Sequence, residues 1–259
     1  MLSTENISFA VGSKRIINDI SIKFHAGEFN MILGPNGSGK STFLKIFSGE
    51  MHGYSGRVCY DDRLLKKQQL SDLAKYRAVM SQQPELSFPL TVEEVVMMGR
   101  YPHFKFNPSR KDQTICNEVI ERLQLACFRE RNYLTLSGGE KQRVQFARVL
   151  TQIWERPQHG NRYLFLDEPL NNLDVSFQQD FLRITREFAQ KDTVVVAVIH
   201  DINLAIQYAD KLFFLKNGSV NASGNTAEIL TTGLISDVFN VSVTIITNPV
   251  TNRPLVVFN

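Results

Sequence analysis

Hydrophobic and polar residues follow two different periods along the chain. Between residues 2 and 24 the apolar side chains alternate with polar ones, as in Ile20, Ile22 and Phe24. Alternation of this kind predicts β-strands with one buried face, and Gly12 marks a turn between them. The chain therefore begins with a strand-rich portion.

Further strands and helices follow from the rest of the pattern. Short runs rich in apolar residues predict strands at Met31–Leu33, Arg57–Tyr60, Val79–Ser81, Tyr163–Leu166, Thr193–Ile199, Leu212–Leu215 and Ser219–Ala222. In the middle of the chain apolar residues recur at helical spacing, in segments that Thr91, Ser109 and Ser137 open as N-caps. Residues 175–189 and 202–209 read as two later helices.

Strand-rich portions on both sides of a helical middle predict an α/β core with an inserted helical subdomain. We expect one domain over residues 1–259. Its core would comprise residues 1–83 and 163–232, and its helical subdomain residues 84–162. Residues 233–259 would form a small strand-bearing C-terminal extension to which the pattern assigns no role.

Composition narrows the class of protein. With 43% hydrophobic residues among 259, the chain can bury a sizeable core. The net charge of +3 comes without a dense Lys/Arg block, so we expect no nucleic-acid partner. Three scattered cysteines suit a reducing cytosol. The longest apolar run, Thr193–Ile199, is far shorter than the roughly 20 residues of a membrane helix, and no secretory leader is recognisable, so we expect a soluble cytoplasmic protein.

A phosphate-binding loop stands between a predicted strand and a predicted helix. Its residues are Gly34, Pro35, Asn36, Gly37, Ser38, Gly39, Lys40 and Ser41, with Thr42 beginning the helix. The glycines let backbone N–H groups approach a polyphosphate, and the helix N-terminus adds a partial positive charge. Lys40 can reach the β- and γ-phosphates, and the Ser41 hydroxyl can ligate Mg²⁺. The alternative, a glycine-rich turn with a chance Lys-Ser pair, explains less of the pattern.

Two carboxylates end the predicted strand at Tyr163–Leu166. In open α/β sheets ligands bind at the carboxyl ends of strands, which is where Asp167 and Glu168 stand. Asp167 would help to hold Mg²⁺, and Glu168 could orient or deprotonate an attacking water. An acidic loop after a core strand is the alternative, and the phosphate loop upstream favours the functional interpretation.

A second anion-binding helix start lies at Ser137, Gly138, Gly139 and Glu140. A hydroxyl, bare backbone N–H groups and the positive end of a helix dipole meet there. Ser-Gly-Gly alone is also a serviceable N-cap. Followed by Glu-x-Gln-Arg, and placed shortly before the carboxylate strand, it becomes a specific signal.

Together these motifs make the chain resemble ABC-type ATPase subunits over essentially its whole length. The resemblance implies a P-loop NTPase fold, with a mixed sheet, an N-terminal antiparallel β subdomain and an inserted α-helical subdomain. It also implies roles for further residues. Gln82 would sense Mg²⁺ and the attacking water, and Asp174 would couple two ATP sites. His200, after the strand Thr193–Ile199, would contact the γ-phosphate, although a lone histidine after a strand is often only a surface residue.

The sequence departs from the family pattern at two places. Family members usually carry an aromatic residue that stacks on adenine just before a glycine in the first strands. Val11 stands there, with Phe9 two residues earlier and Arg15 after the turn, and the choice among them stays open. After Glu168, Leu170 and Asn171 replace the small or hydroxyl residues that the family mostly has.

The segments at residues 86–103 and 200–210 resemble importers of iron chelates, haem and vitamin B12. The connection carrying Trp154 is similar to that of haem-import ATPases, and a variable surface loop is the alternative. The resemblance implies a homodimer that sandwiches two ATP molecules. Its partners would be a membrane permease and, indirectly, an extracytoplasmic substrate-binding protein, at the cytoplasmic face of the inner membrane. The rival function is a soluble cassette ATPase acting on nucleic acid or ribosomes.

Overall fold

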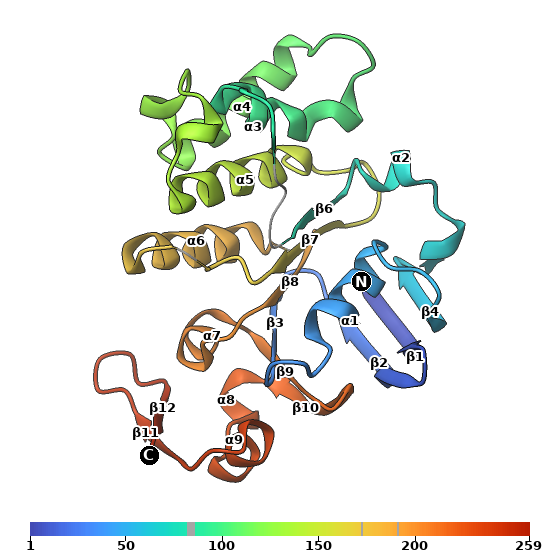
Figure 1. Cartoon of the computed structure of the whole chain (residues 1–259), viewed down its shortest axis with the longest axis vertical. Helices are drawn as coiled ribbons and strands as arrows, with labels where there is room; N and C mark the ends of the chain where they lie inside the picture. Colours follow the sequence, from blue (N-terminus) through green and yellow to red (C-terminus); the bar gives the residue numbers. More distant parts are fainter. Residues whose placement is uncertain (82–85, 172, 191) are drawn as a thin grey trace. The chain divides into compact units, whose positions relative to one another are not determined.

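The computed structural model describes residues 1–81, 86–171, 173–190 and 192–259 (Figure 1). Its contacts divide the chain into two compact units. Unit 1 combines Met1–Lys67 with Leu182–Asn259, and unit 2 is Gln68–Phe181. The second boundary falls inside helix α6 (Val175–Phe188).

An antiparallel sheet begins unit 1. Its strands are β1 (Leu2–Val11), β2 (Lys14–Phe24), β4 (Ser55–Tyr60) and β5 (Arg63–Leu64), in the order β2-β1-β4-β5 (Figure 1). Ile7 pairs with Ile20 across β1 and β2, and both side chains are buried. The alternating pattern thus places one face of this hairpin in the core, as the sequence predicts.

The second sheet of unit 1 is mixed. Strand β3 (Phe29–Leu33) pairs in parallel with both β8 (Thr193–Val198) and β9 (Lys211–Lys216). Strand β10 (Ser219–Asn225) returns antiparallel to β9. All residues of β3 and β8 are buried, as expected for strands covered on both faces. The predicted α/β class with a mixed sheet and an antiparallel β subdomain is confirmed.

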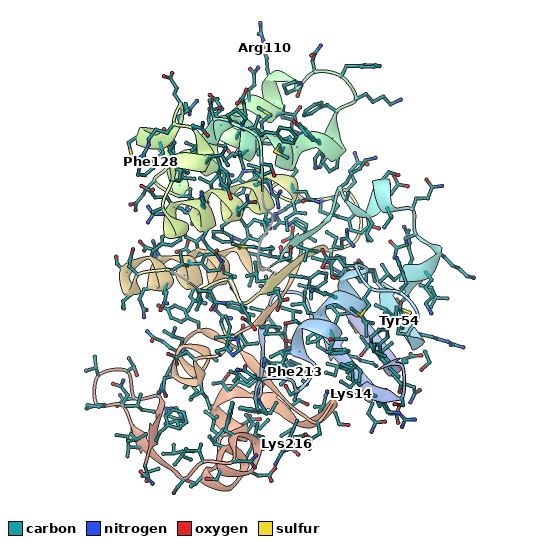
Figure 2. All side chains as sticks on the ribbon, viewed as in Figure 1. Lys14, Tyr54, Arg110, Phe128, Phe213 and Lys216 are labelled. Carbon is teal, nitrogen blue, oxygen red and sulfur yellow. The ribbon has the colours of Figure 1, made fainter. Side chains whose placement is uncertain are left out.

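Helices α1 (Lys40–Ser48) and α7 (Ile202–Tyr208) follow β3 and β8 in the chain. Phe43 and Phe47 on α1 stack edge to face at 4.9 Å between ring centroids. Phe213 on β9, labelled in Figure 2, meets Phe24 of β2 in the same geometry, also at 4.9 Å. Aromatic contacts therefore join both sheets of unit 1 into one core.

The C-terminal part of unit 1 contains helices α8 (Thr226–Ile229) and α9 (Thr232–Phe239) and the hairpin β11 (Val243–Thr247) and β12 (Pro254–Phe258). The strands agree with the expected extension, but α9 was not predicted. The amide of Asn203 on α7 exchanges two hydrogen bonds with the backbone of Val256, at 3.0 and 2.9 Å. These bonds fasten the hairpin to α7.

Unit 2 holds two parallel strands, β6 (Arg77–Met80) and β7 (Arg162–Asp167). Its helices are α2 (Leu70–Leu73), α3 (Val92–Met97), α4 (Arg110–Arg122) and α5 (Gly138–Gln152), and α3, α4 and α5 gather in one group (Figure 1). The predicted N-caps Thr91, Ser109 and Ser137 each form a capping box. Helix α3 gives way to a 3₁₀ helix at Met98–His103, which contains Pro102.

A buried arginine ties the helices of unit 2 together. Arg100 is 1% exposed, and its guanidinium contacts Asp112 Oδ1 at 2.8 Å, the Thr151 carbonyl at 2.8 Å and Glu155. A buried charge is tolerated only with partners of this kind. Within the described ranges, no helix combines the length and the apolar character needed to cross a bilayer.

Candidate nucleotide-binding site

Glycines shape the phosphate loop of unit 1. Gly34 and Gly39 adopt φ values of 152° and 98°, which side-chain-bearing residues rarely adopt. A Cβ on Gly34 would collide with the Leu215 carbonyl, and one on Gly39 would lie 2.7 Å from Ile17 Cδ1. The loop backbone therefore runs so close to its neighbours that a Cβ would not fit at position 34 or 39.

Helix α1 begins without a side-chain cap. Its N-cap Gly39 is left-handed and offers no side-chain acceptor, so the first N–H groups of α1 have no capping side chain. The Lys40 side chain, 5% exposed, donates to the carbonyls of Gly34 at 2.9 Å and Pro35 at 3.0 Å. Among the described residues, the buried Ser38 hydroxyl has no hydrogen-bond partner. A helix start without a side-chain cap, a cation and the unpaired Ser38 hydroxyl, all within one short loop, suit a polyphosphate.

A hairpin that sequence reasoning did not connect with the site supports this loop. Between β9 and β10, Asn217 and Gly218 both have positive φ, as in a type I′ turn. The Gly218 N–H donates to the Ser38 carbonyl at 3.1 Å, and its own carbonyl accepts from the Asn18 N–H at 2.8 Å. An Asn-Gly pair between two predicted strands is the sequence signal that indicates this turn.

The strand register places His200 beside the phosphate loop. Ile32 of β3 pairs with Val198 of β8 in parallel, so Gly34 and His200 each follow a paired position by two residues. His200 is exposed at this edge. The next residue, Asp201, caps α7 by accepting from Asn203 N–H at 2.8 Å and Leu204 N–H at 3.0 Å. The cap fixes the start of α7 directly after the histidine.

The three candidates for the adenine contact lie on the β1–β2 hairpin. Phe9 is half-buried, Val11 is 62% exposed, and Arg15 donates to Asn18 Oδ1 at 3.1 Å. The hairpin reaches the phosphate loop, because the Cβ that Gly39 lacks would meet β2 at Ile17. The choice among the three stays a prediction.

In unit 2, the two carboxylates end β7 in different environments. Asp167 is 2% exposed at the end of a strand whose residues are all buried. Glu168 is half-buried and left-handed, with φ of 50°. The Asn171 amide donates to Glu168 Oε2 at 3.0 Å, and the Gln142 amide of α5 donates to the Pro169 carbonyl at 2.8 Å. Sequence reasoning identified the carboxylates but not these two contacts.

The Ser137–Glu140 motif begins α5. The Ser137 hydroxyl accepts from the Glu140 N–H at 3.3 Å, and the Ser137 N–H donates to Glu140 Oε2 at 2.7 Å. This backbone hydrogen bond, reinforced by the Ser137 side chain, lowers the pKa of the Glu140 carboxyl below its usual value. Ser137 and Gly138 are exposed, and Gly139 and Glu140 are half-buried. The helix start is therefore accessible and already capped by its own side chains.

The remaining predicted residues fall into separate places. Asp174 caps α6, because its Oδ1 accepts from the Phe177 N–H at 2.8 Å. Gln82 lies outside the described residues. Unit 1 thus gathers the phosphate loop, His200 and the β1–β2 hairpin, while unit 2 gathers the β7 carboxylates, the α5 motif and Asp174.

Taken separately, each unit carries groups that fit part of a nucleotide with a hard cation. The Ser41 hydroxyl and the Asp167 carboxylate are oxygen ligands of the kind that Mg²⁺ prefers. The glycine cradle and the unpaired Ser38 hydroxyl in unit 1 fit phosphate oxygens.

Known proteins match the chain closely. A family model described as ABC transporter matches residues 17–171, more than half of the chain. Hemin import ATP-binding protein HmuV of Escherichia coli O157:H7 is 35% identical over 260 residues, covering 100% of both proteins. The HmuV protein of Gloeobacter violaceus is 40% identical over 257 residues, covering 99% of this chain and 94% of the relative.

Solved structures agree on the fold. A chain of a structure assigned to a metal-chelate type ABC transporter, in an inward-facing conformation, has a TM-score of 0.82 at 23% identity and covers 100% of this chain and 96% of its own. A dimeric bacterial ABC transporter cassette has a TM-score of 0.73 at 25% identity, covering 87% of this chain and 99% of its own. The expected P-loop NTPase fold is confirmed. The chain belongs to the ABC transporter family, as an ATP-binding subunit with the ABC ATPase fold.

Proposed function

We propose that this chain is the ATP-hydrolysing, energy-coupling subunit of a membrane importer for haem. One observation carries the proposal: the phosphate loop, with its glycine cradle and buried Lys40, lies in a chain that matches hemin import ATP-binding proteins over their full length. Siderophores and vitamin B12 are the alternative cargoes, because those importers share the segments at residues 86–103 and 200–210.

Residues of unit 1 hold the triphosphate. The loop from Gly34 to Ser41, with Thr42, presents backbone N–H groups to the phosphate oxygens, and Lys40 contributes the positive charge. His200, at the same sheet edge as the loop, donates to the γ-phosphate. The hairpin candidates Phe9, Val11 and Arg15 lie where a base attached to that triphosphate would extend.

Residues of unit 2 perform the proton transfer. Glu168 accepts a proton from the attacking water, and Gln82 orients that water. Ser41, Gln82 and Asp167 would hold Mg²⁺. When bound, this ion neutralises the charge that builds up on the β- and γ-phosphate oxygens.

The complete site needs a second copy of the chain. Ser137, Gly138, Gly139 and Glu140 of one copy close on the γ-phosphate held by the other, and Asp174 couples the two sites. The exposure of Ser137 and Gly138 suits such a contact. The similarity to a dimeric ABC cassette supports the same assembly.

The dimer transmits its closure to a permease at the cytoplasmic face of the inner membrane, where the chain would be a peripheral protein. The permease docks near Gln82 and the helical subdomain, which we assign to residues 84–162. An extracytoplasmic substrate-binding protein would deliver cargo to the permease. The core remains assigned to residues 1–83 and 163–232, with an extension at 233–259.

Transport by a purified complex tests the proposal. The tagged chain is isolated from its host in detergent, and the membrane protein retained with it is reconstituted with it in vesicles. We expect ATP-dependent uptake of haem, and its loss in Glu168→Gln, which keeps the shape of the side chain but removes the base. The variant should still bind ATP and accumulate as a dimer.

Each part of the proposal has its own contrary result. Uptake of a ferric siderophore or vitamin B12 in place of haem would overturn the cargo but leave the ATPase intact. Normal hydrolysis by Glu168→Gln would remove Glu168 from its role as the base. Salt-sensitive retention on nucleic acid, without any membrane partner, would favour the rival cassette ATPase.

A further inference from the structure

The loop after Glu168 carries an asparagine that contacts the carboxylate directly. The Asn171 Nδ2 donates to Glu168 Oε2 at 3.0 Å, and the Asn171 backbone N–H donates to the Glu168 carbonyl at 3.5 Å. An ionised carboxylate only accepts hydrogen bonds, so the asparagine must present its NH₂ group to it. This is one of the positions where the sequence departs from the small or hydroxyl residues of the family pattern.

Two helices hold the backbone of this loop in place. From α5, Gln142 Nε2 donates to the Pro169 carbonyl at 2.8 Å. From α6, Gln178 Nε2 donates to the carbonyls of Leu170 at 3.3 Å and Leu173 at 3.2 Å. The Leu170 side chain is only 9% exposed, which adds an apolar anchor. The carbonyls of Pro169, Leu170 and Leu173 are therefore each held by a hydrogen bond from a helix, and Asn171 directly follows two of these anchored residues.

The Glu168 side chain needs such a partner. Its backbone is left-handed, with φ of 50°, a conformation that a residue with a Cβ rarely adopts, so this end of β7 is built with some strain. A glutamate side chain has three rotatable bonds and is only half-buried here, so it can adopt several rotamers. The hydrogen bond from Asn171 favours one of them. A serine or alanine at position 171 would have a shorter reach or no donor.

We propose that Asn171 is a positioning residue, which holds the Glu168 carboxylate in the orientation that accepts the proton of the attacking water. The inference rests on the proposed function, in which Glu168 is the base. Asn171 touches neither water nor phosphate in this role and acts only through Glu168. Its contribution belongs to the chemical step and not to ATP binding.

Asn171→Asp is the sharpest variant, because aspartate has the same shape and the same turn preference but no NH₂ group, and it places a negative charge against Glu168. We expect the full chain carrying it to hydrolyse ATP with a kcat lowered roughly 100-fold. Asn171→Ala should lower kcat roughly tenfold, since it removes the donor without adding repulsion. Both variants should keep the KM and the Kd for ATP within about twofold.

Asn221 supplies a matched control. It also donates to a carboxylate, Asp237 Oδ2 at 3.2 Å, and like Asn171 it is exposed, but it lies on β10 in unit 1, away from the Glu168 carboxylate in the chain. Asn221→Asp therefore makes the same change of charge and should keep the wild-type kcat. If Asn171 served only to shape the turn, Asn171→Asp would behave like this control, and the inference would be wrong.

Glu168→Gln separates this inference from the proposed function. If Glu168→Gln loses hydrolysis while Asn171→Asp retains it, the role of Asn171 is refuted and the role of Glu168 stands. If Glu168→Gln hydrolyses ATP normally, the proposed base is wrong, and with it the role assigned to Asn171. An equal loss of ATP binding and of kcat in both Asn171 variants would also overturn the inference, because it would indicate general damage to the site.

Discussion

The two helix N-termini that we propose bind phosphate are built in opposite ways. Helix α1 begins at the left-handed Gly39, with no side chain capping its first N–H groups. Helix α5 begins at Ser137, where the serine and Glu140 each accept the other's backbone N–H. The first has no side-chain cap, whereas the second satisfies two backbone N–H groups with its own side chains.

The two helix starts also differ in how far their residues are exposed to solvent. Lys40 is 5% exposed and bonded to the loop's own carbonyls, whereas Ser137 and Gly138 face solvent. A loop with a buried lysine and a helix start that has no side-chain cap is a site prepared for a ligand before it arrives. An exposed, self-capped helix start is stable alone and can meet a phosphate brought by another molecule. If α1 holds the nucleotide and α5 closes on the nucleotide of another copy, as we propose, the difference teaches that these two tasks place different demands on a helix terminus.

The largest effect should come from the cation of the open site. Lys40→Ala removes the one ammonium group of the phosphate loop and its two bonds to the loop carbonyls. We expect the Kd for ATP to rise about 100-fold, which corresponds to about 2.7 kcal/mol. Titration calorimetry with the full chain measures this Kd directly.

Lys23→Ala is the matched control for charge. Lys23 is an exposed residue near the end of β2, at the opposite end of that strand from the β1–β2 turn, so its loss should change the Kd for ATP less than twofold. Equal losses of affinity in the two variants would mean that net charge, and not the geometry of the loop, attracts the nucleotide.

Much of this contrast could be predicted from the sequence. The phosphate loop stands in a short motif between a fully apolar strand and a helix, so the order of residues alone identifies Gly34 and Lys40. The capping box at Ser137 is equally local, because the serine and Glu140 are three residues apart. Features determined by neighbouring residues in the chain are readable from their order.

Contacts between distant segments could not be predicted. The bond from Gln142 to the Pro169 carbonyl joins residues 27 positions apart, and the support of Ser38 by Gly218 depends on the order of strands in the sheet. Asn171 is a mere departure from the family pattern in the sequence, whereas the fold brings its amide to the carboxylate through the left-handed turn at Glu168. Helix α9 was missed although Leu234, Ile235 and Val238 have helical spacing, because strand-like runs dominate the tail.

Removing the serine cap of α5 should have two smaller effects, one on stability and one on hydrolysis. Ser137→Ala removes the hydroxyl that accepts from the Glu140 N–H, so the free energy of unfolding should fall by about 1 kcal/mol. Hydrolysis should fall roughly tenfold if the hydroxyl also meets the partner's phosphate. Chemical denaturation and steady-state ATPase assays measure the two quantities.

Ser109→Ala isolates the structural part. Ser109 forms the same capping box at the start of α4 and lies outside the proposed ATP sites. The Ser109→Ala variant should lose about the same free energy of unfolding as Ser137→Ala and keep the wild-type kcat. If Ser137→Ala matched Ser109→Ala in both quantities, the α5 terminus would be only a cap.

The smallest effect concerns the pH dependence of that cap. The backbone N–H of Ser137 is the main cause that lowers the pKa of Glu140, so the folded chain binds this proton more weakly than the unfolded chain does. Stability from Glu140 is therefore fully present above its usual pKa of about 4.3, and is lost as the pH falls through the lower, folded value. Because the carboxylate is partly screened by solvent, the effect should stay below about 1 kcal/mol. Glu140→Gln should remove it, as measured by unfolding free energies between about pH 6 and pH 3.

The two halves of the capping box can then be separated. Ser137→Ala keeps the backbone N–H that donates to Glu140, so it should retain most of the pH dependence while losing stability at every pH. Glu140→Gln should do the reverse, keeping the serine's bond to residue 140 and losing the pH dependence. If Ser137→Ala abolished the pH dependence instead, the hydroxyl and not the backbone would hold the carboxylate. The Glu140 carboxylate would then depend on the Ser137 hydroxyl, and not on the backbone N–H of the capping box that distinguishes α5 from α1.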